Sequence, residues 1–222
     1  MESEIWEMVR AERQTLADLL EALDDEQWQT RSLCTEWTVR EVATHLLMTP
    51  AREPGPWALV KALVRARGHL WYAGRDVVVD YASRRSTAEL VTDLRSQAGS
   101  RTRPLFVADR NILLDLLVHG QDIAVPLGIR RDVPPAAGRV GLERVWSMGW
   151  PFHARRHLRD VHLRVEDGSW QAGAGPDVVG AAGALLLLAT GRSEAALGQL
   201  DGPGVPLLRD RLAPRSRSAE RP

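Results

Sequence analysis

Residues 112–123 have the sequence ILLDLLVHGQDI, in which a few polar side chains interrupt an otherwise aliphatic stretch. Nearly every residue around Asp115 and His119 is aliphatic, and a helix that is apolar on all sides is a buried helix. We expect it to cover about residues 108–125. Asp115 and His119 are four residues apart and share one face, and Asp122 lies close to that face. Because a buried, unpaired carboxylate is costly, the stripe is either a hydrogen-bonded polar cluster or part of a metal site.

A second helix carries a matching feature. Thr38 followed by Glu41 three residues later is the capping-box pattern that begins a helix. On that helix His45 lies among aliphatic residues. If the two helices face each other, His45, Asp115 and His119 can converge. Two imidazoles and one carboxylate form a recurrent catalytic ligand set with one coordination position left open. Zinc suits these ligands, and nickel and iron(II) suit them too.

Each of these polar residues also has a plainer interpretation. A histidine on an apolar helix face is usually a hydrogen-bonded core residue. Glu41 either completes the helix cap or orients His45 from behind, and Asp122 either orients His119 or makes a polar contact at the helix end. Cys34 lies near the start of the second helix, where the pKa of a thiol can fall. We favour its interpretation as a small buried side chain.

Composition excludes several classes of protein. The chain has 222 residues with 29 basic and 29 acidic side chains, so it lacks the basic excess of a nucleic-acid-binding domain. A single cysteine excludes an internal disulfide and a cysteine-rich zinc site, and it fits a reducing compartment. The N-terminus lacks a signal-peptide pattern, and the longest apolar stretch, residues 178–189, is shorter than the ~20 residues of a membrane span. We therefore expect a soluble cytoplasmic protein.

Hydrophobic periodicity predicts an antiparallel helical bundle in the first part of the chain. The helices expected there cover residues 3–24, 38–50, 56–67, 70–83, 87–98 and 108–125. Residues 129–138, IRRDVPPAAG, are typical of a linker.

Beyond the linker we expect a small α/β unit. Its predicted elements are a helix at 139–148, a strand at 161–165, a turn at Asp167–Gly168, a return strand from Trp170, a helix at 177–190 and two short helices split at 201–204. The organisation expected from this is a bundle over 1–128, an α/β domain over 133–213 and a disordered tail over 214–222.

A second histidine-containing segment contrasts with the apolar helices. His153, His157 and His162 lie among arginines in FHARRHLRDVHLRV, residues 152–165, a polar segment unlike the apolar surroundings of His45 and His119. We expect a solvated loop and strand there. Alternatively, its arginines bind an acidic thiol cofactor or a substrate carboxylate.

Two motifs, SLCTEWTVREVATHL at 32–46 and DLLVHGQDIAVPLG at 115–128, resemble the mycothiol-dependent maleylpyruvate isomerase family. That family is related to the DinB-like metal-binding four-helix bundles. Residues 162–192, HLRVEDGSWQAGAGPDVVGAAGALLLLATGR, and the later LDGPGV are similar to its sterol-carrier-protein-like C-terminal domain. The resemblance covers about residues 6–212. It implies an α+β fold with a DinB-like bundle followed by a small α/β domain.

The resemblance also implies a cofactor and a chemistry. A divalent metal, usually zinc, would be held by His45 and by the pair Asp115 and His119. Asp115 is a departure, because the family usually has the longer glutamate there, so the helix must approach the metal more closely. The activity implied is that of a mycothiol-dependent transferase or isomerase in which a metal-activated thiolate attacks a small electrophile.

Two alternatives stay open beside that activity. The first is a metal-dependent hydrolase, and the second is a non-catalytic small-molecule-binding protein with a decayed metal site. We expect a low-molecular-weight thiol and a small-molecule substrate as partners, without nucleic acid or membrane. We also expect a monomer or homodimer.

Overall fold

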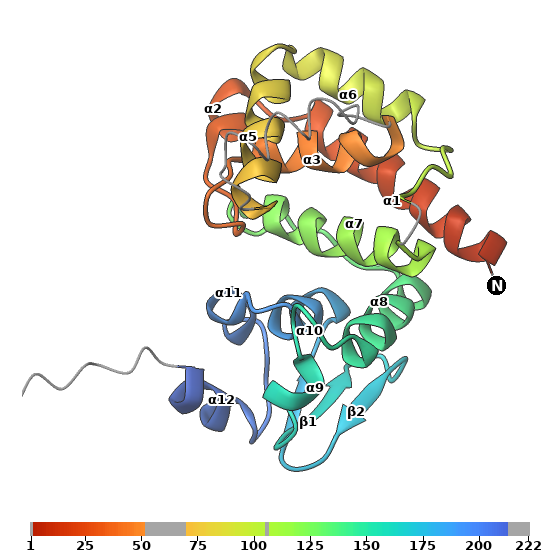
Figure 1. Ribbon diagram of the computed structural model, residues 1–222. Helices are drawn as coiled ribbons and strands as arrows, with labels where there is room; N and C mark the ends of the chain where they lie inside the picture. Colours follow the sequence, from red (N-terminus) through yellow and green to blue (C-terminus); the bar gives the residue numbers. More distant parts are fainter. Residues whose placement is uncertain (1, 52–69, 105–106, 213–222) are drawn as a thin grey trace, which may run out of the picture.

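The computed structural model describes residues 2–51, 70–104 and 107–212. The fold is α+β, with helices in the N-terminal part and a small three-stranded sheet with further helices in the C-terminal part (Figure 1). This confirms the predicted fold class. Within the described residues, no helix is long and apolar enough to cross a membrane.

The N-terminal helices form a bundle. They are α1 (Glu2–Glu21), α2 (Asp25–Gln29), α3 (Val39–Ala51), α5 (Leu70–Ser83), α6 (Thr87–Ser96) and α7 (Asp109–Ala124). Helices α1, α7, α3 and α6 pack in a ring, each against the next, while α2 and α5 pack against α3. The amphipathic pattern explains this packing, because Val9, Leu16 and Leu20 of α1 are buried along one stripe.

Helix α7 is the central element of the molecule. One side contacts α1 and α3, and another side contacts the C-terminal helices α8 (Pro135–Ser147) and α10 (Ala182–Ala189). Helix α7 lies between the two parts in Figure 1. This arrangement explains why α7 is apolar on all sides, as its sequence predicts. One apolar core therefore runs across both parts, and independent domains at 1–128 and 133–213 stay a prediction.

The C-terminal part is built around a sheet with strand order β2-β1-β3. Its strands are β1 (His162–Val165), β2 (Gln171–Gly173) and β3 (Asp177–Gly180). Strand β1 pairs antiparallel with β2 and parallel with β3. The remaining helices are α9 (Ala154–His157), α11 (Ser193–Leu197) and α12 (Val205–Leu212). The β1–β2 turn has Gly168 at a φ of +74°, a conformation that glycine adopts without strain.

Two predicted boundaries are wrong, and residues 154–157, expected to lie in a loop, form the short helix α9. Residues 177–180 form β3 and not the start of a helix, because Val178 is buried in an alternating pattern and pairs with β1. A short apolar run does not distinguish a strand from a buried helix by periodicity alone. Helix α8 begins at Pro135 instead of residue 139, since proline is favoured in the first helical turn. The helix predicted at 56–67 and the tail predicted at 214–222 lie outside the described residues.

Candidate metal centre

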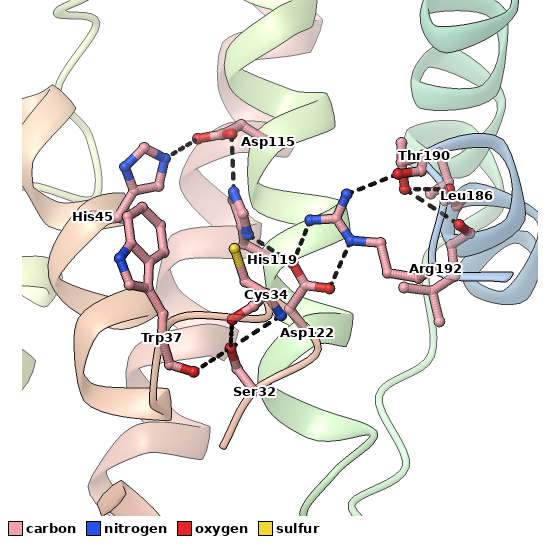
Figure 2. A network of polar contacts seen from close by, with 11 residues as sticks. Ser32, Cys34, Trp37, His45, Asp115, His119, Asp122, Leu186, Thr190 and Arg192 are labelled. Atoms are coloured by element: carbon pink, nitrogen blue, oxygen red, sulfur yellow. Dashed lines mark hydrogen bonds and ion pairs between the residues drawn. The ribbon is translucent and has the colours of Figure 1, made fainter. Parts of the chain in front are cut away.

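The three residues that the sequence singles out come together between α3 and α7 (Figure 2). His45 projects from α3, and Asp115 and His119 project from α7, one helical turn apart. The Nε2 atom of His45 lies 3.4 Å from Oδ2 of Asp115, and Nε2 of His119 lies 3.4 Å from Oδ1. All three side chains offer a ligand atom within 4.8 Å of one another, so the group could hold a metal ion.

These distances suit a shared metal ion as well as direct ion pairs. Nitrogen–oxygen hydrogen bonds in proteins usually span about 2.7–3.2 Å, which is shorter than the two 3.4 Å contacts. Two ligand atoms, each about 2.0–2.1 Å from a tetrahedral zinc ion, lie about 3.4 Å apart. The carboxylate of Asp115 stands at this distance from both imidazoles. The Asp115 side chain is shorter than the glutamate that the resemblance implies. It still comes close enough to both imidazoles to share a metal ion with them.

Each charged side chain of this group shifts the pKa of the others that face it. Burial alone would raise the pKa of Asp115, but the facing His45 and His119 outweigh it and lower this pKa to about 2. Burial would lower the pKa of His45, but the Asp115 carboxylate outweighs it and raises this pKa above its usual 6.5. Asp115 is therefore ionised across the physiological range and can act as an anionic ligand.

Asp115 is less enclosed than its sequence neighbours suggest. Its side chain is 40% exposed, whereas the adjacent Leu114 and Leu116 are buried. The expectation of a fully buried carboxylate is thus wrong, because Asp115 faces a cavity of about 190 Å³ instead of the core. A metal at this group would have an open side toward that cavity.

The cavity wall joins the two parts of the molecule. Helix α7 supplies one side, and residues from the C-terminal part supply the other. Its lining residues, besides Asp115 and His119, are Asn111, Leu114, Val118, Met148, Pro151, Phe152 and Arg192. The wall is largely apolar, with Arg192 as its cationic side chain among these described residues.

His119 is fixed by a second carboxylate. Its Nδ1 atom lies 2.8 Å from Oδ2 of Asp122, a side chain with 0% exposure. Arg192 donates to both oxygens of Asp122, at 3.0 and 2.8 Å. Burial would raise the pKa of Asp122, but hydrogen bonds from His119 and Arg192 outweigh it and lower this pKa. The predicted contact between Asp122 and His119 is therefore present.

His45 has a different support. The ring of Trp37 lies 5.2 Å from the His45 ring, and Trp37 is also 6.4 Å from the ring of His119. Glu41 accepts hydrogen bonds from the amide and hydroxyl of Thr38, at 2.6 and 2.9 Å. This contact belongs to the predicted helix cap. The other predicted role of Glu41, orienting His45, stays a prediction.

Cys34 lies close to the same site. Its sulfur, His119 and Asp122 form a second group whose ligand atoms lie within 4.8 Å of one another. Burial and the nearby Asp122 carboxylate raise the pKa of the Cys34 thiol to about 11. Cys34 is therefore a neutral thiol at physiological pH, which argues against a nucleophilic role.

The histidines of residues 152–165 do not form a comparable group. His162 pairs with Asp177 at 2.8 Å, and the rings of His153 and His157 lie 6.3 Å apart. Within the described part of the chain, the groups able to hold a metal are the two around His119. Sequence reasoning did not single out Arg192, because its contact with Asp122 joins residues 70 positions apart.

Fold and site together define a helical-bundle protein with a candidate metal centre of two histidines and one aspartate. Residues 9–124 match the family model described as the mycothiol maleylpyruvate isomerase N-terminal domain. The chain belongs to this family. No curated protein sequence matches the chain.

Solved structures show the same fold over nearly the whole chain. A crystal structure of the mycothiol-dependent maleylpyruvate isomerase aligns with a TM-score of 0.59 at 15% identity, covering 91% of this chain and 93% of that one. A histidine-to-alanine mutant of the isomerase aligns with a TM-score of 0.54 at 14% identity, with the same coverage. At these identities the likeness concerns the fold, which includes the C-terminal part beyond residue 124.

Proposed function

We propose that this protein is a metal-dependent, mycothiol-dependent transferase or isomerase that acts on a small electrophilic substrate. The observation that carries the proposal is the spacing of His45, Asp115 and His119, which suits a zinc ion with one side open to a cavity. Family membership supports the choice of mycothiol as the thiol cosubstrate.

In this proposal the chain's own residues hold the metal and shape the pocket. His45 and His119 supply neutral nitrogen ligands through Nε2, and Asp115 supplies the anionic ligand. A zinc ion bound there would favour the thiolate form of a coordinated thiol, which is the nucleophilic form. Asp122 keeps the His119 ring in place by accepting a hydrogen bond from Nδ1.

The cavity argues for a small reacting group. The described residues enclose about 190 Å³, less than the ~300–1,000 Å³ of typical ligand pockets. Leu114, Val118 and Phe152 make much of the wall apolar. This volume suits the cysteinyl end of a thiol cosubstrate together with a small electrophile.

A thiol-dependence assay tests the proposal. The zinc-loaded protein is incubated with mycothiol and either maleylpyruvate, as an isomerase probe, or monochlorobimane, as a transferase probe. We expect turnover that requires mycothiol in at least one arm. The matched control is zinc-treated His119→Ala, which should give only the uncatalysed rate. Absence of thiol-dependent turnover with both probes and a wider panel of electrophiles would contradict the proposal.

The same assay separates the other candidate functions. A metal-dependent hydrolase would cleave an activated ester such as p-nitrophenyl acetate at a rate that mycothiol leaves unchanged. A non-catalytic protein with a decayed site would bind no zinc and show neither activity. The low pKa of Asp115 and its distance from both imidazoles favour a working ligand over a decayed site.

A further inference from the structure

We propose that Arg192 is a positioning residue for the candidate metal centre. Through Asp122 it holds the His119 ring with Nδ1–H toward Asp122 and the Nε2 lone pair toward Asp115. The expected effect on metal binding rests on the proposed function. The orientation and tautomer of the His119 ring apply to the metal-free protein as well. Arg192 lies outside residues 9–124, so the family match does not include it.

The contact between Arg192 and Asp122 is a two-pronged ion pair. Arg192 Nε donates to Asp122 Oδ1 at 3.0 Å, and Nη2 donates to Oδ2 at 2.8 Å. The third nitrogen, Nη1, donates to the carbonyl of Thr190 at 2.9 Å. Figure 2 shows the guanidinium lying between Asp122 and Thr190. All three nitrogens are thus engaged, which fixes the planar fork in one orientation.

The pairing determines which nitrogen of His119 carries its proton. A carboxylate that receives two hydrogen bonds from a guanidinium is ionised and can only accept further bonds. The Asp122 oxygen 2.8 Å from His119 therefore requires a proton on Nδ1. In a neutral imidazole this leaves the lone pair on Nε2, the atom that faces Asp115. The C-terminal part thereby prepares a ligand atom that belongs to the bundle.

Asp122, which lies between Arg192 and His119, is fully buried. Its side chain has 0% exposure and Arg192 has 17%, so water competes little for their contact. The backbone carbonyl of Asp122 also accepts a hydrogen bond from the amide of Leu33 at 3.1 Å. Without Arg192, the buried Asp122 carboxylate would lose its counter-charge and both of the contacts that fix its orientation.

A competing role for Arg192 is to bind the substrate, because it lines the cavity beside His119. In that case its loss would weaken substrate binding but leave the metal and the His119 tautomer unchanged. Positioning predicts the reverse, since the guanidinium acts on Asp122 before any ligand enters. The two roles are therefore separable by measurements on the protein without substrate.

The experiment uses Arg192→Gln, Asp122→Asn and the double variant in the full chain. Zinc affinity is measured by competition with a chelator. We expect each single variant to bind zinc about 10–100-fold more weakly, the range for lost contacts behind a metal ligand. The double variant should bind zinc about as tightly as the single variant with the larger loss. The reason is that both changes break the same contacts from Arg192 through Asp122 to His119. Arg192→Lys should recover part of the loss, since it restores charge without the fork.

The matched control is Arg209→Gln. Arg209 also belongs to the C-terminal part and donates to a backbone carbonyl, that of Leu197, at 3.2 Å. It should leave zinc affinity unchanged. Cobalt(II) substitution adds a spectroscopic test: the visible spectrum of Arg192→Gln should shift from that of the wild type, while the spectrum of Arg209→Gln should not.

The His119 tautomer in the metal-free wild type decides the inference independently of activity and of variant folding. Long-range ¹H–¹⁵N correlation spectra should show Nδ1 protonated at a pH where the ring is neutral. A proton on Nε2 would overturn the inference. Unchanged zinc affinity in a folded Arg192→Gln, with a raised KM alone, would also overturn it and assign Arg192 to substrate binding. Failure of the wild type to bind zinc would instead contradict the proposed function.

Discussion

Two regions of this chain are notable for histidine, and they differ in what surrounds it. In α3 and α7, His45 and His119 are isolated among aliphatic residues, and the fold brings both to one carboxylate. In residues 152–165, three histidines lie among arginines, and their contacts are scattered. An isolated polar side chain on a buried helix needs a partner, whereas a polar residue in a solvated segment has water. Apolar context is thus more informative than histidine density.

The largest effect should follow removal of either imidazole. We expect His119→Ala and His45→Ala to weaken zinc binding by more than about 100-fold, because each removes a direct ligand and even contacts behind a ligand are worth 10–100-fold. Helical content should persist, since the apolar core does not depend on the metal. Chelator competition and circular dichroism measure the two quantities. Near-wild-type affinity in both variants would contradict the ligand assignment.

Replacing Asp115 should have a smaller effect on zinc affinity, and two different replacements separate its charge from its length. Asp115→Asn keeps the volume and removes the charge, and we expect zinc affinity to fall by at least about 10–100-fold. Asp115→Glu introduces the longer carboxylate that the family resemblance implies at this position, so we expect affinity to be retained. Titrations of the wild type and both variants check this. Equal affinity in all three would show that Asp115 is not a ligand.

The pH dependence of zinc binding should be intermediate in size. Asp115 stays ionised down to about pH 2, so it contributes no dependence between pH 5 and 8. His45 has a raised pKa, and its proton must leave before the nitrogen binds a metal. Affinity should therefore fall as pH drops through the His45 pKa, by about tenfold per pH unit for one displaced proton. A flat profile from pH 5 to 8 would exclude His45.

The free energy of unfolding of the metal-free protein should change with pH in the opposite direction to zinc affinity. The pKa of His45 is raised in the folded state, so its pairing with Asp115 stabilises the fold fully below the unfolded value near 6.5. This contribution is lost as pH rises through the folded pKa. Urea titrations on either side of this range, with His45→Ala as the control that lacks the effect, measure it.

The smallest effect should come from the other histidine region. His157 is exposed on α9, and its ring lies 6.3 Å from that of His153. His157→Ala should leave zinc content unchanged and alter the free energy of unfolding by less than about 0.5 kcal/mol, as for most surface substitutions. Loss of bound zinc in this variant would remove the contrast between the two regions.

How far the sequence predicts this protein depends on the distance between interacting residues. Residues three or four positions apart on a helix lie on the same face. The shared face of Asp115, His119 and Asp122 can therefore be seen in the sequence alone. The approach of His45 needs two helices to face each other, and only its unusual apolar context and the family resemblance indicate it in the sequence. The helical bundle was predictable for the same reason, because its signal lies within each helix.

The parts that sequence reasoning missed depend on contacts between distant segments. The sequence predicts a helix over residues 177–190, but its first four residues form β3, because periodicity alone does not distinguish a short buried strand from a buried helix. The exposure of Asp115 depends on a cavity whose far wall comes from Met148, Pro151 and Phe152. Arg192 reaches Asp122 only because α10 packs against α7.

The most direct test of the account is the metal content of the wild-type protein. The full chain is purified without added metal, and bound zinc, nickel and iron are quantified by elemental analysis alongside a sample reconstituted with zinc and dialysed. The arrangement of His45, Asp115 and His119 predicts about one divalent ion per chain, with zinc favoured. A protein that is purified metal-free and retains no zinc after reconstitution would contradict the central claim.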